Sequence, residues 1–135
     1  MIQYEETFQK LFVRSLKTSG FDVREEVSPS GMNSYADIYL PNYDTMFELK
    51  VGDDQRKGIG QCLQYDNHCE TSILLVPKGR VDIEIGKLAT ENGLGYACFN
   101  AEDSELHTAA PYDFAIQSEL RLDGRFTFTV CRLVI

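Results

Sequence analysis

The stretch YADIYLPNYDTMFELKV, from Tyr35 to Val51, decides the expected fold. Its two ends, residues 35–40 and 45–51, are short runs rich in apolar and aromatic side chains. The residues between them, 41–44, are turn formers, and a connection of this length suits a hairpin. The sequence therefore predicts two antiparallel strands here.

Pairing Leu40 with Thr45 would place Asp37 directly opposite Glu48 on the neighbouring strand. Opposed side chains share one face of a sheet, with their Cβ atoms about 5 Å apart, so two carboxylates there repel each other. Such a pair either has one raised pKa or recruits a cation, and carboxylate oxygens suit Mg²⁺ or Mn²⁺. A slip of one residue would move Asp37 to the other face, so this hypothesis depends on the register.

Lys50 extends this group of charges along the second strand. Residues two apart in a strand point to one face, so Glu48 and Lys50 share a face, and the apolar residues around them share the other. An ammonium group here would orient a water molecule or steady negative charge on a phosphate. The ordinary alternative is that Asp37 faces solvent, and that Glu48 and Lys50 form a surface ion pair worth under about 1 kcal/mol.

The other segments predict an α/β domain with a mixed sheet flanked by helices. The first helix carries apolar residues at helical spacing and ends at Gly20. The run TSILLVP is continuously apolar, as in a strand covered on both faces. The predicted segments are a helix at 4–19, a strand at 21–27, a helix at 57–69, a strand at 71–77, a helix at 82–92 and a strand at 95–100.

Beyond this core, taken as residues 4–99, the sequence predicts a C-terminal extension at about 118–135. Asp123-Gly124 lies between alternating apolar residues, which is a strong signal for a hairpin. The hairpin has three alternative places: it extends the sheet, forms a small second sheet, or pairs with another subunit to make a homodimer. All 135 residues are assigned to a single domain.

Charge and hydropathy limit the classes of partner. The formal net charge of −8 argues against a surface that holds nucleic acid by charge alone, although a local basic patch or a divalent cation can carry the contact. The basic groups are Lys50 with Arg56 and Lys57, and Lys78 with Arg80. No apolar run suits a membrane helix and no signal peptide is visible, so we expect a cytoplasmic, intracellular protein without membrane association.

The four cysteines, Cys62, Cys69, Cys98 and Cys131, are scattered and form no C-x-x-C pair. Scattered thiols in an intracellular protein are usually small buried hydrophobic residues, and we expect that role over a metal or disulfide role. His68 beside Cys69 suggests zinc, but no second close ligand pair accompanies it.

Gln61 and Tyr65 lie four positions apart in the helix predicted after the hairpin, and therefore on one helix face. A glutamine there can hydrogen-bond a backbone carbonyl or a metal-bound water, and a tyrosine can stack on a base or bond a phosphate. The ordinary alternative is an exposed glutamine beside a half-buried tyrosine. The core edge of this helix is expected at Ile59, Cys62 and Leu63.

Asp37, then Glu48-Leu49-Lys50 on the next strand, then Gln61-Cys62-Leu63-Gln64-Tyr65 on the next helix, together resemble the PD-(D/E)XK nuclease superfamily. The Q-x-x-x-Y element is similar to the RecB-like exonuclease branch. The resemblance covers about residues 4–99 and implies a restriction-endonuclease-like core. One departure is Ala36, which stands where the family has proline before the aspartate.

The resemblance implies Mg²⁺- or Mn²⁺-dependent hydrolysis of phosphodiester bonds in DNA, less often in RNA. Asp37 and Glu48 would hold the metal, with the carbonyl of Leu49 as a further ligand. Lys50 would position the attacking water and stabilise the transition state.

The same resemblance implies supporting residues around this centre. Gln61 and Tyr65 would support the site or the strand being cut. Many members add a glutamate from the first helix, and here Glu5 is preferred to Glu6 because it shares the apolar helix face. The candidate contacts to nucleic acid are Arg56, Lys57 and Tyr65.

Several functional alternatives stay open at this point. The DNA is single-stranded, duplex or branched, and the action is that of an endonuclease or an exonuclease. The alternative function is a catalytically inactive nucleic-acid-binding or protein-interaction module of the same fold.

Overall fold

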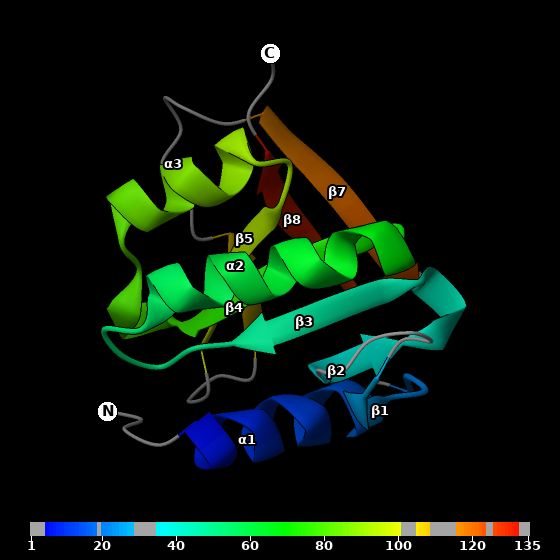
Figure 1. The fold of residues 1–135 in the computed structure, drawn as a ribbon. Coiled ribbons are helices and arrows are strands. Elements are labelled where there is room, and N and C mark those ends of the chain that lie inside the picture. The colour runs from blue at the N-terminus through cyan, green and yellow to red at the C-terminus, as the bar shows by residue number, and fades with distance from the viewer. Residues whose placement is uncertain are drawn as a thin grey trace.

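The protein has an α/β architecture, in which a mixed sheet is flanked by helices (Figure 1). The computed structural model describes residues 5–18, 20–28, 35–100, 105–108, 116–123 and 126–132. The helices are α1 (Glu5–Thr18), α2 (Gln55–Tyr65) and α3 (Ile83–Glu91). The expected class of fold is therefore confirmed.

Eight strands form one sheet in the described part of the chain, in the order β1-β2-β3-β4-β5-β8-β7, with β6 also paired to β5. The pairs β1–β2 and β2–β3 are antiparallel, whereas β3–β4 and β4–β5 are parallel. The strands are β1 (Arg24–Val27), β2 (Ala36–Leu40), β3 (Thr45–Leu49), β4 (Thr71–Pro77), β5 (Gly95–Asn100), β6 (Glu105–Thr108), β7 (Ile116–Asp123) and β8 (Phe126–Arg132).

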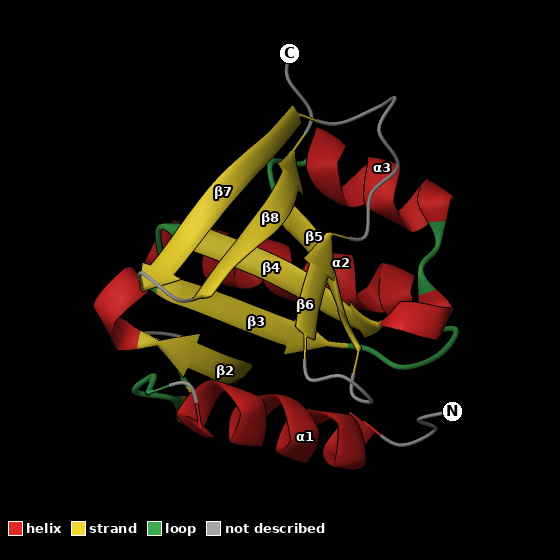
Figure 2. Ribbon diagram, turned by 180° about the vertical axis from the view of Figure 1, so that it is seen from behind, coloured by secondary structure: helices red, strands yellow, loops and turns green. Residues whose placement is uncertain are grey.

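Helices cover both faces of the sheet, and β4 shows this directly because all its residues are buried. Ile73 and Leu75 belong to a core cluster that includes Phe12 and the rest of the apolar face of α1. Leu74 and Val76 belong to a second cluster with residues of α2 and α3. In Figure 1, α2 lies in front of β4, and in the reverse view of Figure 2 it lies behind it. The predicted burial of this strand on both faces is confirmed.

The end of α1 follows from the glycine in its sequence. Gly20 has a φ of 93°, and its N–H donates to the carbonyl of Lys17. The N–H of Phe21 donates to the carbonyl of Leu16, and both of these apolar side chains lie in the core cluster of α1. This pair of hydrogen bonds satisfies carbonyls that the helix end would leave unpaired. A side chain at this φ would be strained, so Gly20 is what allows the chain to turn.

Hydrogen bonds to Asp44 hold the connection between β2 and β3 in place. It consists of a 3₁₀ turn, Pro41–Tyr43, followed by Asp44 in the left-handed conformation (φ 46°, ψ 47°). The carboxylate of Asp44 accepts hydrogen bonds from the Tyr39 hydroxyl at 2.8 Å and from the N–H of Glu70 at 2.9 Å. The carbonyl of Asp44 accepts from the N–H groups of Glu70 and Thr71. The turn is thereby tied to β2 and to the beginning of β4.

Some predicted boundaries are wrong. The helix predicted at 57–69 begins and ends earlier, because the chain tightens into a 3₁₀ turn at Asp66–His68 before it enters β4. Leu63 is exposed rather than at the core edge, since the buried stripe of α2 continues from Cys62 to Tyr65. Strand β6 was not predicted.

The C-terminal hairpin extends the sheet, which selects one of the three alternatives. Strands β7 and β8 are antiparallel, as predicted, and β8 pairs with β5 through Tyr96 and Cys131. Residues 124–125 and 133–135 of the predicted extension lie outside the described residues. The possible homodimer stays a prediction.

Two further expectations concern cysteines and membranes. Cys62 and Cys98 are buried, as expected, whereas Cys69 is half-buried, and all three are free thiols in the described structure. The side chain of Cys131 lies outside the described residues. None of the described helices combines the length and the apolar character that crossing a membrane requires.

Candidate functional site

The β2–β3 hairpin brings Asp37 and Glu48 together. The register pairs Leu40 with Thr45, which confirms the assumed pairing. One oxygen of Asp37 accepts a hydrogen bond from the N–H of Leu49 at 2.8 Å, and the carboxyl groups of Asp37 and Glu48 hydrogen-bond each other. A hydrogen bond between two carboxyl groups needs a proton on one of them. The hairpin thus holds a carboxyl pair of the kind that shares a proton or a cation.

Glu48 is the more deeply buried member of the pair. Its residue surface is 3% exposed, and its Oε2 is buried with no hydrogen-bond partner among the described residues. Burial, and next the negative charge of Asp37, raise the pKa of Glu48 to about 9, against the opposing effect of Lys50. The side chain is therefore neutral near pH 7 in the metal-free protein.

The carboxyl groups of Asp37 and Glu5 also have pKa values above those they would have in water. Burial raises the pKa of Asp37, and the negative charge of Glu26 adds to this, although the hydrogen bond from Leu49 acts in the other direction. Burial raises the pKa of Glu5 as well, while Lys50 opposes the shift. In both groups the loss of contact with water raises the pKa by more than the favourable contacts lower it.

Lys50 is the buried cation of the site, with its side chain 8% exposed. Its Nζ lies 4.0 Å from Oε1 of Glu48, 3.9 Å from Oε2 of Glu5 and 3.7 Å from Oδ2 of Asp54. Its backbone N–H donates to the carbonyl of Leu75 in β4. The ammonium is therefore surrounded by carboxyl groups from β3, α1 and the loop before α2.

Gly58 of α2 lets the stem of Lys50 pass beneath the helix. A Cβ atom added at Gly58 would lie 2.8 Å from Cγ of Lys50 and 2.7 Å from Cδ1 of Leu74. Both distances are shorter than side chains tolerate, so one of these neighbours would have to move. Gly60, two positions further along the same helix, has nothing within 4 Å of such an atom.

We expect Gly58→Ala and Gly60→Ala to have effects of opposite sign on folding stability. Gly60→Ala should raise the free energy of unfolding by about 0.5–1 kcal/mol, because alanine favours the helix. Gly58→Ala should lower it by about 1–3 kcal/mol through overpacking, and should displace Lys50. Urea unfolding of the two variants measures this difference, and equal stabilisation by both would contradict the close approach.

Gln61 and Tyr65 both lie in α2, but their surroundings differ. Gln61 is partly buried, and its Oε1 is buried without a hydrogen-bond partner in the described part of the chain. Tyr65 is 1% exposed, and its hydroxyl donates to the carbonyl of Tyr35, next to the beginning of β2. The expected contact of Tyr65 with nucleic acid is therefore wrong, because no face of the buried ring is open to a base. Its contact with Tyr35 supports the strand that carries Asp37.

The other expected residues lie around the same end of the sheet. Arg56 and Lys57 are exposed in the first turn of α2. Glu5 contacts Lys50, whereas Glu6 is exposed and pairs with Lys10 at 3.2 Å, so the preferred glutamate is the one beside the site. From the sequence, Asp54 is expected only to add negative charge just beyond the site, whereas its carboxylate lies 3.7 Å from the ammonium of Lys50.

The flank of the site between α1 and β1 is strongly acidic. A pocket of about 450 Å³ lies there, and it contains one lysine and one glutamine beside its acidic side chains. The acidic residues are Glu5, Glu6, Glu25, Glu26 and Asp37. Because like charges repel, a phosphate chain is disfavoured on this side of the site unless cations are present.

One observation indicates that the site suits a divalent cation: the Oε2 of Glu48 is buried and has no hydrogen-bond partner among the described residues. Carboxylate oxygens of Asp37 and Glu48, with the carbonyl of Leu49, are the donors that Mg²⁺ and Mn²⁺ prefer. Within the described residues, however, no three His, Cys, Asp or Glu side chains form a ready-made metal centre. The carboxyl pair would thus be the main holder of the ion, since Glu5 is engaged with Lys50.

Comparisons with known proteins bear on the fold alone. No protein-family model matches the chain, and no curated protein matches it. A solved structure, the SPO1766 protein of unknown function from Silicibacter pomeroyi, is similar, with a TM-score of 0.53 and 20% sequence identity. The similarity covers 82% of this chain and 75% of that one. At this identity, the similarity supports the α/β fold and carries no statement about activity.

Proposed function

We propose that this protein is a metal-dependent nuclease with a restriction-endonuclease-like core, which hydrolyses phosphodiester bonds in DNA. The observation that carries the proposal is the Asp37–Glu48 pair, in which Asp37 is half-buried and Glu48 is buried with an unpartnered carboxyl oxygen, beside the buried Lys50. Removing two neighbouring carboxyl groups from water costs folding stability, so a chemical use accounts for them better than packing does. The resemblance to PD-(D/E)XK nucleases supports the same conclusion.

Asp37 and Glu48 would hold Mg²⁺ or Mn²⁺, with the carbonyl of Leu49 as a further ligand. When bound, the cation supplies positive charge to the phosphate and acidifies a bound water. Glu48 must lose its proton to act as a ligand, so metal affinity and pH are linked at this residue. Asp37 keeps its orientation through the hydrogen bond from the N–H of Leu49.

Lys50 acts on the reacting groups themselves. Its ammonium orients the attacking water and stabilises the negative charge that develops on the phosphate. The carboxylates of Glu5 and Asp54 hold the ammonium in place, at 3.9 and 3.7 Å. Gln61 supports the site, because its buried Oε1 is able to accept a hydrogen bond from an ordered water.

The test is a cleavage assay with labelled single-stranded, blunt duplex and four-way-junction DNA. Each substrate is incubated with Mg²⁺, with Mn²⁺ or with EDTA. We expect cleavage with either metal and none in EDTA. Lys50→Met protein, purified in parallel, controls for contaminating nucleases and should not cleave. The preferred substrate then distinguishes an exonuclease from an enzyme that cuts branched DNA.

Failure of the folded, metal-loaded protein to cut any of these substrates would overturn the proposal. The better assignment would then be an inactive binding module of the same fold. Cleavage that persists in EDTA, or that Lys50→Met retains, would contradict the proposed roles of the metal and of this lysine.

A further inference from the structure

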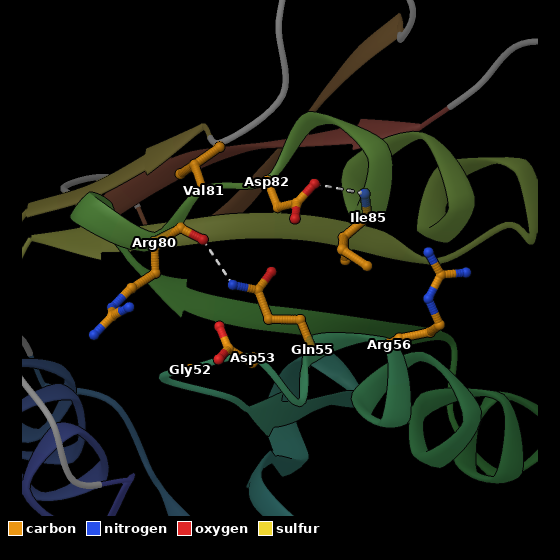
Figure 3. Close-up of a pocket in the computed structure, with 8 residues that line it drawn as sticks. All are labelled: Gly52, Asp53, Gln55, Arg56, Arg80, Val81, Asp82 and Ile85. Atoms are coloured by element: carbon orange, nitrogen blue, oxygen red, sulfur yellow. Dashed lines mark hydrogen bonds between the residues drawn. The ribbon is translucent and has the colours of Figure 1, made fainter.

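A pocket of about 400 Å³ lies on the other flank of the site, between the beginning of α2 and the segment that links β4 to α3 (Figure 3). Lys50 begins the loop between β3 and α2, and residues further along this loop line the pocket. Gly52 and Asp53 line the pocket, whereas the next residue, Asp54, contacts the ammonium of Lys50. Anything bound in the pocket therefore lies next to the candidate active site.

A buried polar network fixes the walls of this pocket. Gln55 is 6% exposed, and its Nε2 donates to the carbonyl of Arg80 at 2.6 Å. The Oε1 of Gln55 accepts from the hydroxyl of Tyr96 at 2.8 Å, and this hydroxyl accepts from the N–H of Asp82 at 3.0 Å. The first turn of α2 is thereby joined to the backbone that carries Arg80. These buried hydrogen bonds therefore fix the backbone position of Arg80.

Two guanidinium groups stand at opposite ends of the pocket, those of Arg56 and Arg80 (Figure 3). Neither forms an ion pair within the described residues. The Nε of Arg80 is buried and has no hydrogen-bond partner among those residues. A buried donor of this kind costs free energy unless a ligand or a water accepts its hydrogen bond. The arginines are thus available to an anion.

Two acidic side chains, Asp53 and Asp82, also line the pocket, but they do not neutralise the positive charge of the two arginines. Asp82 caps α3, because its Oδ1 accepts from the N–H groups of Glu84 and Ile85. Asp53 is exposed, and water screens its charge. The opposite flank, by contrast, gathers five acidic side chains around one lysine. The electrostatic field around the site therefore favours a chain of phosphates at the pocket that contains Arg56 and Arg80, here called the arginine pocket.

We propose that the pocket between α2 and α3 binds the phosphodiester backbone of the nucleic acid next to the bond that is cut. Arg56 and Arg80 each contact a phosphate, since guanidinium groups bind phosphate through paired, charge-assisted hydrogen bonds. Their positions at opposite ends of the pocket suit a chain laid across it better than one small anion. This assignment rests on the proposed nuclease function and adds to it the direction in which the substrate lies.

The test measures binding separately from cleavage. The probe is a fluorescent single-stranded oligonucleotide of about 15 nucleotides with phosphorothioate linkages, which resist hydrolysis. Fluorescence anisotropy gives its affinity for the full chain with Mg²⁺ at several salt concentrations. Arg56→Gln and Arg80→Gln should each weaken binding about three- to tenfold, and each should reduce the slope of log affinity against log salt by about 1. Arg14→Gln, an exposed arginine of α1, removes the same charge elsewhere and should leave both quantities nearly unchanged.

The outcomes separate this pocket from the proposed activity. If Arg56→Gln and Arg80→Gln bind as Arg14→Gln does, or if the wild-type protein does not bind the probe, the pocket assignment is overturned. If inorganic phosphate at millimolar concentration displaces the probe, the pocket is a site for a single anion and the assignment is again overturned. If the arginine variants lose binding as expected and the wild-type protein does not cleave DNA, the pocket stands and the nuclease function falls.

Discussion

Replacing Glu48 with glutamine is expected to abolish metal-dependent cleavage and to leave the metal-free protein folded, with a weaker dependence of stability on pH. Glutamine keeps the shape of the protonated carboxyl group and keeps a donor for Asp37. It cannot become an anionic metal ligand. We expect cleavage to fall at least ~10³-fold, since the metal would lose one of its two carboxylates.

The change in pH dependence follows from the pKa of Glu48. In the unfolded chain this pKa lies near 4.5, and in the folded protein burial and Asp37 raise it to about 9. The stabilising contribution of the neutral form is therefore fully present below about pH 4.5 and is lost as the pH rises through about 9. Between these values Glu48 should lower the free energy of unfolding by up to about 1.4 kcal/mol per pH unit.

Urea unfolding in EDTA at pH 6, 7 and 8 measures this effect. The wild-type protein should lose stability across the series, and the Glu48→Gln protein should lose much less. Glu91→Gln, at an exposed position of α3, is the matched control and should follow the wild type. Parallel curves for wild type and Glu48→Gln would show that Glu48 is ionised in the folded protein, which would contradict its neutral state beside Asp37.

Metal binding offers a second readout for the same variant. Mn²⁺ should raise the unfolding temperature of the wild-type protein, and this rise should grow from pH 6 to pH 8 as the proton on Glu48 is more easily displaced. The Glu48→Gln protein should show little rise at any of these pH values. A full response in the variant would place the metal elsewhere.

Replacing Lys50 with methionine is the second change for which we expect a large effect, a loss of at least ~10³-fold in the cleavage rate. Methionine preserves most of the stem that packs against Gly58 and removes the ammonium. The loss should appear in kcat more than in KM, because the proposed role of Lys50 is to stabilise charge that develops in the transition state.

Lys17→Met provides the control for this experiment, since Lys17 is exposed in the last turn of α1. Circular dichroism and urea unfolding show whether both variants keep the fold. We expect Lys50→Met to stay folded, because Glu48 is neutral near pH 7 and the carboxyl groups of Glu5 and Asp54 are in part exposed to water. A Lys50→Met protein that retains cleavage within tenfold of wild type would remove Lys50 from the mechanism.

The parts of the site that the sequence predicts correctly are those that depend on local geometry. A short connection of turn formers between two strands fixes which residues face each other, so the neighbourhood of Asp37 and Glu48 follows from counting positions. The i, i+2 rule then places Lys50 on the same side. Helix α1 and its end at Gly20 follow in the same way from apolar spacing and one glycine.

The parts that the sequence does not predict depend on contacts between distant segments. Tyr65 is buried against Ala36 and Met46, and its hydroxyl donates to the carbonyl of Tyr35, which comes just before β2. The arginine pocket exists because Gln55 hydrogen-bonds the backbone of Arg80. Neither pair has a fixed spacing in the sequence, so no periodic pattern indicates it. The need for glycine at position 58 likewise appears only when the helix is seen against Lys50.

The turn at residues 41–44 limits how the sequence of this protein can change during evolution. Because Asp44 fixes that turn to Tyr39 and to the beginning of β4, the number of residues between Asp37 and Glu48 sets the distance between their carboxyl groups. One inserted or deleted residue here would turn one carboxyl group away from the other, even though the turn lies at the far end of the hairpin. Surface loops elsewhere tolerate changes in length far better. Distant relatives that keep this chemistry should therefore share the spacing from Asp37 to Lys50 long after the rest of their sequences have diverged.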